Sequence, residues 1–193
     1  ADIHLTIDAN LQQKAFDAIK EAVDRLHVPG AAVVAIDPRD GAVRALASYP
    51  SYDPNAFIRG LTQDEATRYL ASEERPLFNR AVSGEYPSGS TIKPAIAAAA
   101  LAEGIITPQT TVQSTGGIRL GQQFFPDWRA GGHGTTNVYH AIADSVNTFF
   151  YTIGGVYEDF TGLGVEKITE HLKRFGLYNQ LGIDLPGEQD GFL

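Results

Sequence analysis

The chain has 193 residues, of which 23 are acidic and 15 basic, so its formal net charge at pH 7 is −8. This acidic balance argues against nucleic acid and anionic membrane surfaces as main partners. The apolar fraction of 43% and the charged fraction of 20% are those of a globular protein with one sizeable core. The sequence contains no cysteine, which excludes a disulfide framework and a thiolate metal site.

The first residues predict a strand, a helix and a β-hairpin. Residues 3–7 alternate like a short strand, and Asp8 is a suitable N-cap for the helix that follows. The expected inward face of that helix carries Leu11, Ala15, Ala18, Ala22 and Leu26. The apolar run 31–36 suits a strand buried on both faces. A turn at 37–41 then leads into a second strand at 42–48.

The remaining sequence predicts mostly helices. Residues 62–65 form a capping box, and a longer helix follows Ser90 and stops at Gly104. The glycine-rich stretch 114–136 predicts an irregular loop or small hairpin, after which Asn137 is placed to cap another helix. This order predicts an α/β protein of the α+β kind, with an antiparallel sheet rather than alternating βαβ units.

Ser90 and Lys93 form the most informative pattern. They are three residues apart at the start of a predicted helix, so their side chains share one face. A serine hydroxyl needs a base to become nucleophilic. A lysine amine is that base only where burial or a nearby cation lowers its pKa. Gly89 permits the tight backbone that exposes the hydroxyl, and the pattern therefore predicts a serine nucleophile activated by an amine.

The same tetrapeptide has an ordinary structural interpretation. Ser-x-x-Lys is expected about once by chance in a chain of this length. A serine near a helix start is usually a cap, and a lysine in the first turn usually points to water. The tetrapeptide alone leaves both interpretations open.

Ser145 and Asn147 are a second candidate pair. On one continuous helix, residues two apart do not face the same way. If both side chains reach one cleft, the helix must break between them, with Ser145 as a proton relay and Asn147 as a substrate contact. The alternative is that the two residues are a helix terminus and a cap.

A joint signature of Ser-x-x-Lys, a Ser-x-Asn type motif and Lys-Thr-Gly characterises penicillin-binding proteins and serine β-lactamases. The sequence resembles this superfamily in the two motifs above and in several further segments, which are Leu5–Gln12, Ala35–Val43, Tyr49–Asn55, Phe78–Ala81 and Gly182–Gly187. Residues 52–55 (Tyr-Asp-Pro-Asn) and 86–91 (Tyr-Pro-Ser-Gly-Ser-Thr) are similar to the class B, elongation type, which is the penicillin-binding protein 2 family.

The resemblance implies a penicillin-binding and serine β-lactamase-like fold, in which helices flank an antiparallel sheet beside a helical subdomain. It implies a peptidoglycan D,D-transpeptidase. Ser90 would be acylated by the penultimate D-alanine of a stem peptide, with Lys93 as base and with Ser145 and Asn147 as the second motif. A neighbouring stem-peptide amine would then attack the acyl-enzyme, and a β-lactam would stall at that stage.

The resemblance also implies partners and a location. The partners are peptidoglycan stem peptides, β-lactams and, through the full-length protein, a membrane-embedded glycan polymerase; nucleic acid and cofactors are not expected. The domain would face the periplasm of a protein anchored in the inner membrane. The sequence contains no signal peptide and no apolar run of membrane-spanning length, so we expect the anchor outside these residues.

The third motif of the signature is missing, since Lys-Thr-Gly, Lys-Ser-Gly and His-Thr-Gly do not occur in the sequence. In the family this motif lies well beyond the equivalent of Gly187. We therefore expect residues 1–193 to be a partial transpeptidase domain that lacks the C-terminal part of the fold and is inactive alone. Residues 1–85 are assigned to the first strands and helices of the α/β part, and residues 86–193 to the nucleophile helix and helical subdomain.

Residues 125–134 resemble a segment of elongation-type members, some of which bind zinc through an Asp and a His at the positions of Asp127 and His133. The other two ligands, an upstream Asp and a Cys inside the second motif, are not matched, because residues 113–115 contain no acid and the inner residue is Val146. Two ligands fall short of a closed tetrahedral site. We expect Asp127 and His133 to share a structural hydrogen bond and to bind no metal.

Two other functions remain open. A serine β-lactamase or β-lactam sensor of the same fold would need a deacylating base or a sensing partner, and the sequence shows no additional acid placed to activate water. A non-catalytic cell-wall scaffold is favoured by the missing third motif, and binding without acylation would indicate it.

Overall fold

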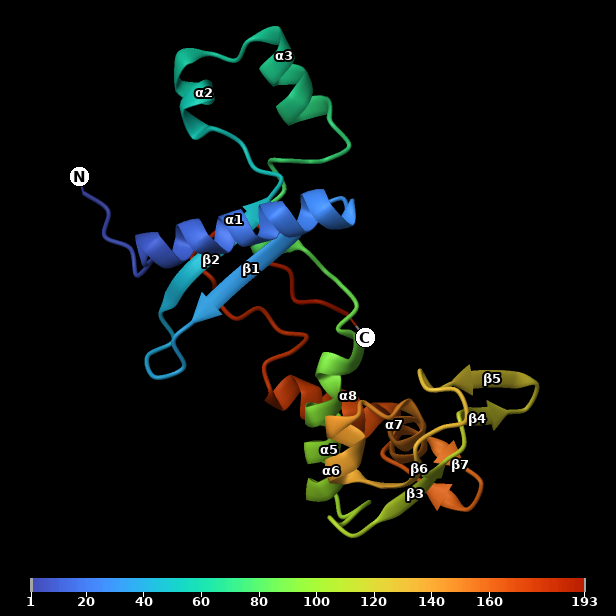
Figure 1. Cartoon of the computed structure of the whole chain (residues 1–193). Helices are drawn as coiled ribbons and strands as arrows, with labels where there is room; N and C mark the ends of the chain where they lie inside the picture. The colour runs from blue at the N-terminus through green and yellow to red at the C-terminus, as the bar shows by residue number, and fades with distance from the viewer. Residues whose placement is uncertain (1, 193) are drawn as a thin grey trace. The chain divides into compact units, whose positions relative to one another are not determined.

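The computed structural model describes residues 2–192 and divides into two compact units (Figure 1). The first unit contains Ala1–Glu85 and Gly182–Gln189, and the second contains Tyr86–Leu181 and Asp190–Leu193. Residues 182–189 thus group with the first unit, whereas the sequence analysis assigned them to the second. No helix within residues 2–192 is both long enough and apolar enough to cross a membrane.

The first unit is built on a β-hairpin. Strands β1 (Ala31–Ile36) and β2 (Val43–Tyr49) pair antiparallel, with Ala31 opposite Tyr49 and an irregularity between Ala35 and Ile36. The predicted hairpin is therefore confirmed. The predicted burial of β1 on both faces is wrong for the described residues, because Val34 is 45% exposed and Ile36 57% exposed. Within residues 2–192, β1 pairs with β2 alone, and these two side chains are left partly exposed.

Helix α1 (Ala9–Leu26) begins where the sequence predicts. The Asp8 carboxylate accepts hydrogen bonds from the Asn10 and Leu11 backbone N–H groups, which an N-cap satisfies. The preceding residues 3–7 form no strand, contrary to the prediction. They are joined to the hairpin by isolated bonds, such as the one from the Thr6 hydroxyl to the Val43 carbonyl.

The buried face of α1 differs from the prediction. Helix α1 packs on both strands of the hairpin, and its buried residues are Ile19 and Val23, whereas Leu26 is exposed. The side-chain amide of Gln12 accepts from the Leu46 N–H and donates to the Leu46 carbonyl, both at 2.8 Å. These bonds to β2 turn the polar Gln12 toward the hairpin. The spacing of apolar residues alone therefore predicts the wrong buried face for α1.

The rest of the first unit consists of short helices, which are α2 (Pro54–Arg59), α3 (Gln63–Ala66), the π-helix η1 (Thr67–Ala71) and α4 (Arg80–Ser83). The predicted capping box is confirmed, because the Thr62 hydroxyl accepts from the Glu65 N–H while the Glu65 carboxylate accepts from the Thr62 N–H.

The second unit surrounds an apolar core with helices and short strand pairs. Its helices are the 3₁₀ turn η2 (Gly89–Ile92), α5 (Lys93–Ala102), α6 (Val138–Ala143), α7 (Asn147–Gly154) and α8 (Gly164–Arg174). Its antiparallel pairs are β3 (Thr111–Ser114) with β6 (Gly134–Asn137), β4 (Gly117–Leu120) with β5 (Gln123–Pro126), and β7 (Val156–Tyr157) with β8 (Phe160–Thr161). The stretch predicted as a loop or small hairpin therefore contains the β4–β5 hairpin.

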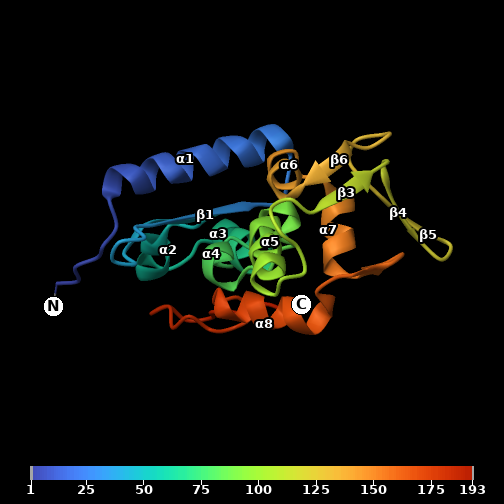
Figure 2. The ribbon, with the colours of Figure 1, turned by 90° about the horizontal axis from the view of Figure 1, so that it is seen from below.

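Helix α7 lies at the centre of this unit, in contact with α5, α6 and α8 and beside β3 (Figure 2). Phe149 and Ile153 of this helix are fully buried and belong to one core cluster with Ala97 and Ala100 of α5. The two sequence motifs are thus held by helices that pack against each other. Helix α5 contributes alanines to this contact, and α7 contributes large apolar side chains. Close packing of this kind fixes their separation.

Glu103, which follows α5, forms ion pairs with α8. These ion pairs predict that the stability of the fold depends on pH. Glu103 pairs with Lys167 at 2.7 Å and with His171 at 2.9 Å, and the hydrogen bonds from Lys167 and His171 lower its pKa to about 2 from an ordinary 4.5. A carboxylate with a lowered pKa stabilises the fold above its unfolded pKa, and this contribution disappears as the pH falls through the folded value. We expect Glu103→Gln to lower the melting temperature at pH 7, and the difference from wild type to shrink between pH 4.5 and 2. Circular dichroism melts would contradict this if the difference stayed constant with pH; Glu170→Gln, on the exposed surface of α8, is the control.

Candidate functional site

Ser90 and Lys93 are placed by the turn that opens α5. Gly89 has φ +56°, a left-handed conformation that glycine adopts readily, and it precedes Ser90 in the 3₁₀ turn η2. The Lys93 backbone N–H donates to the Ser90 carbonyl, which holds the two residues one tight turn apart. Ser90 is exposed, whereas the Lys93 side chain is buried with 8% exposure.

Ser145 and Asn147 lie at a break between two helices, which is the arrangement that a shared cleft requires. Helix α6 ends at Ala143 and α7 begins at Asn147. Ser145 has φ +53°, a left-handed conformation that costs about 1 kcal/mol or more for a residue with a side chain. This kink brings residues two apart to the same side of the chain.

The Lys93 amine is the point where the two motifs meet. Its Nζ donates to the Ser145 carbonyl at 2.7 Å, to the Ser145 hydroxyl at 2.9 Å and to Asn147 Oδ1 at 2.6 Å. The Phe150 ring centroid lies 5.4 Å from Nζ. Burial lowers the pKa of Lys93 from its ordinary value, while the negative charge of Asp127 partly opposes this effect. A lysine with a lowered pKa can accept a proton at lower pH than lysine in water.

The structure brings three of the four predicted catalytic residues into direct contact, whereas the Ser90 hydroxyl takes no part in these bonds. Lys93, Ser145 and Asn147 are hydrogen-bonded, and Ser90 precedes Lys93 by one turn. The Ser90 hydroxyl has no hydrogen-bond partner among residues 2–192, and Ser90 is exposed to solvent. An exposed hydroxyl at the start of a helix, in the turn before a buried lysine, suits a nucleophile that an incoming carbonyl can approach.

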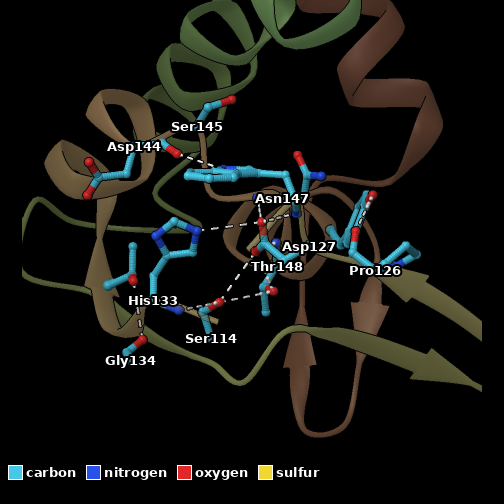
Figure 3. A network of polar contacts seen from close by, with 12 residues as sticks. Ser114, Pro126, Asp127, His133, Gly134, Asp144, Ser145, Asn147 and Thr148 are labelled. Carbon is cyan, nitrogen blue, oxygen red and sulfur yellow. Dashed lines mark hydrogen bonds and ion pairs between the residues drawn. The ribbon is translucent and has the colours of Figure 1, made fainter. Parts of the chain in front are cut away.

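Asp127 lies behind the second motif at the centre of a hydrogen-bond network (Figure 3). Its Oδ1 accepts from the backbone N–H groups of Trp128 and Asn147, at 2.9 and 3.2 Å. Its Oδ2 accepts from the Thr148 N–H at 2.9 Å, from the Thr148 hydroxyl at 2.8 Å and from the Ser114 hydroxyl at 3.3 Å. Burial raises the pKa of Asp127, but the bonds from Thr148, Asn147 and Trp128 outweigh it and the pKa lies below its ordinary value.

The expected hydrogen bond between Asp127 and His133 is not formed. His133 Nε2 is 3.7 Å from Asp127 Oδ1, beyond hydrogen-bond distance, and it is buried without a partner in the described part of the chain. The reason is competition, because closer donors already occupy both carboxylate oxygens of Asp127. The His133 ring instead packs edge-on against Trp128, with centroids 5.1 Å apart.

Sequence reasoning missed Ser114 and Thr148. The sequence singles out residues 113–115 only for their lack of an acid, and it does not single out Thr148. Both are buried and hydrogen-bonded to Asp127, and the Ser114 hydroxyl also accepts from the His133 N–H. The one available signal is that Thr148 directly follows Asn147 at a helix start, where side chains commonly satisfy backbone groups. Among residues 2–192 no three His, Asp or Glu side chains gather as a metal site.

Comparison with known proteins identifies the family of the chain. Residues 31–193 match the family described as the penicillin binding protein transpeptidase domain, and the chain belongs to this family. Its relatives include peptidoglycan D,D-transpeptidase MrdA of Salmonella typhimurium, 40% identical over 194 residues, which cover 100% of this chain and 29% of that protein. The MrdA protein of Escherichia coli is 38% identical over 192 residues, which cover 98% of this chain and 28% of that one.

Solved structures support the same conclusion. PBP2 of Pseudomonas aeruginosa superimposes with a TM-score of 0.84 at 36% identity, over 100% of this chain and 41% of that one. The elongation-type resemblance and the predicted fold class are therefore confirmed. The chain spans less than a third of the length of the curated relatives named above.

The contacts of Lys93 predict how its pKa responds to substitution. In wild type, titration of the Lys93 side chain by carbon-13 NMR should give a pKa below the ordinary 10.5, because burial disfavours the charged amine. Asn147→Asp puts a carboxylate at the position that now lies 2.6 Å from Nζ and should raise this pKa above the wild-type value. Asp144→Asn, beside the motif, is the control and should change it little. An unchanged pKa in Asn147→Asp would show that the two groups are not in contact in solution.

Proposed function

We propose that the protein containing this chain is a peptidoglycan D,D-transpeptidase, with Ser90 as nucleophile, Lys93 as base, and Ser145 and Asn147 as proton relay and substrate contact. One observation carries the proposal, namely the buried amine of Lys93 held by Ser145 and Asn147, one helical turn from the exposed hydroxyl of Ser90. Membership of the transpeptidase family supports the same assignment.

The proposed reaction has two steps. The Ser90 hydroxyl oxygen attacks the carbonyl of the penultimate D-alanine of a stem peptide, and neutral Lys93 takes the hydroxyl proton directly or through Ser145. The peptide bond to the terminal D-alanine breaks, the proton passes to its amine, and an acyl-enzyme remains. The amine of a second stem peptide then attacks this ester, Ser90 recovers its proton, and the cross-link is complete.

Lys93 and Asn147 have complementary parts in this reaction. Asn147 Oδ1 accepts from the amine at 2.6 Å, so the amide NH₂ is left to donate to a substrate carbonyl. The burial that lowers the pKa of Lys93 increases the fraction of neutral amine at a given pH. Acylation should therefore rise with pH through the pKa of Lys93.

Acylation by penicillin has been seen in a structural neighbour. The penicillin-binding protein A of Mycobacterium tuberculosis, with a TM-score of 0.79 at 28% identity, was solved as a penicillin G acyl-enzyme complex. The present chain is similar to it over 96% of its length. This supports β-lactams as covalent ligands of Ser90.

We further propose the partners and location of the complete protein. PBP2 of Helicobacter pylori, with a TM-score of 0.82 at 32% identity, was solved in a complex with MreC, and another neighbour comes from a peptidoglycan synthase complex of polymerisation and crosslinking. The complete protein would work on the periplasmic face of the inner membrane, anchored by a segment outside these residues, beside a membrane-embedded glycan polymerase.

The nucleophile is tested by labelling. Incubation of the complete protein with a fluorescent penicillin, followed by peptide mass spectrometry, should give one adduct on Ser90 that persists without rapid hydrolysis. Ser90→Ala should abolish the adduct, because the acyl group has no oxygen to attach to, whereas Ser88→Ala should keep it. An adduct on another residue would overturn the assignment, and rapid turnover of the β-lactam would favour a β-lactamase.

The missing third motif predicts the behaviour of the isolated chain. In the family that motif supplies an oxyanion donor and one wall of the cleft, so residues 1–193 alone should form no detectable penicillin adduct while the complete protein does. Circular dichroism should show whether the isolated chain is folded during the assay. A stoichiometric Ser90 adduct on the short chain would contradict this prediction.

A further inference from the structure

We propose that Asp127 is a positioning residue, a metal-free anchor whose hydrogen bonds fix the helix break that presents Ser145 and Asn147 to Lys93. This inference rests on the proposed function, since it concerns the same site. It assigns to Asp127 and its neighbour Trp128 a role that the two sequence motifs do not reveal.

The first observation concerns the start of α7. The residue before it, Val146, is the N-cap and has no side-chain acceptor for the free N–H groups of the first helical turn. The Asp127 carboxylate takes over this task from another part of the chain, because it accepts from the Asn147 and Thr148 N–H groups and from the Thr148 hydroxyl. A negative charge at this end of a helix is also stabilised by the helix dipole.

The second observation concerns the other side of the break. The indole N–H of Trp128 donates to the Asp144 carbonyl at 2.9 Å. Asp127 and Trp128 are consecutive, so one short segment holds the chain both before and after Ser145. Ser145 needs such support, because its left-handed backbone is unfavourable on its own.

The third observation is that Asp127 and the residues around it do not provide a suitable set of ligands for zinc. A carboxylate offers about four lone-pair positions, and protein N–H and O–H groups already donate to both of its oxygens. Ser114 contributes a hydroxyl, and the fully buried Val146 contributes no ligand atom. That leaves His133, whose Nε2 lies 3.7 Å from Asp127 Oδ1, as the second ligand beside Asp127. Two ligands do not close a tetrahedral zinc site. The residues therefore do not fit the zinc site that the elongation-type resemblance suggests.

The experiment uses the complete protein and the rate of acylation by fluorescent penicillin as a function of pH. Asp127→Asn turns an NH₂ group toward N–H donors and should slow acylation at least ten-fold. It also removes the negative charge that raises the pKa of Lys93, so the rise of the rate with pH should move to lower pH. A purely structural role of Asp127 would lower the acylation rate without shifting the pH–rate profile. His133, the titratable side chain beside Asp127, is present in both wild type and Asp127→Asn, so the two proteins do not differ in this group.

Asp144→Asn is the matched control. It makes the same chemical change directly before Ser145, but the Asp144 carboxylate is exposed and points away from the network (Figure 3). Its rate and pH profile should stay within two-fold of wild type. Trp128→Phe is the second variant, because it keeps an aromatic ring at a 62% exposed position and removes the bond to the Asp144 carbonyl. It should slow acylation several-fold with an unchanged melting temperature.

The outcomes separate this inference from the proposed function. If wild type is not acylated on Ser90, the proposed function fails. If wild type is acylated and folded Asp127→Asn reacts at the same rate with the same pH profile, the anchor role is overturned; if Asp127→Asn does not fold, a native rate in Trp128→Phe overturns it instead. Dialysis against a zinc chelator should change neither the rate nor the melting temperature. A loss that added zinc restores would show a metal site in place of the metal-free anchor.

Discussion

The site depends on one buried amine and the oxygens that surround it. Lys93 Nζ is removed from most contact with water and has three acceptors between 2.6 and 2.9 Å, all from Ser145 and Asn147. A buried ammonium without acceptors is strongly destabilising, so these contacts hold the amine while burial lowers its pKa. The same environment therefore keeps Lys93 in place and increases the fraction of neutral amine at a given pH. Ser90 needs no such support, because it stays in solvent one turn away.

The second unit supplies this environment through a backbone arrangement that is unfavourable locally. Helix α7 starts without a capping side chain of its own, and Ser145 adopts a left-handed conformation. Asp127 and the packing of Phe149 in the core offset these costs from outside the motif. Local strain at a functional residue is commonly held in this way by the surrounding structure. The chemistry of the site and the stability of the unit thus use the same hydrogen bonds.

Local rules predicted much of the fold and part of the site. The Asp8 cap, the Thr62–Glu65 capping box and the β1–β2 hairpin follow from bonds and turns that join residues a few positions apart, which the sequence shows directly. Helix geometry requires a break at Ser145 only if Ser145 and Asn147 serve one cleft, and the structure contains that break. The motifs and the family resemblance named the four candidate catalytic residues, and the structure joins Lys93, Ser145 and Asn147 by hydrogen bonds.

By itself, then, the sequence determined the start of α1, the capping box and the β1–β2 hairpin, and it named the residue types that could carry the chemistry. Only the tertiary structure decided which of them touch. Lys93 meets Ser145 from 52 positions away, and Asp127 binds Thr148 rather than His133. The buried face of α1 and the exposure of β1 were likewise decided by their neighbours. The physical reason is that hydrogen bonds between distant segments depend on how the intervening loops close and on which donors lie nearest each acceptor in the folded chain. Local periodicity in the sequence reports neither.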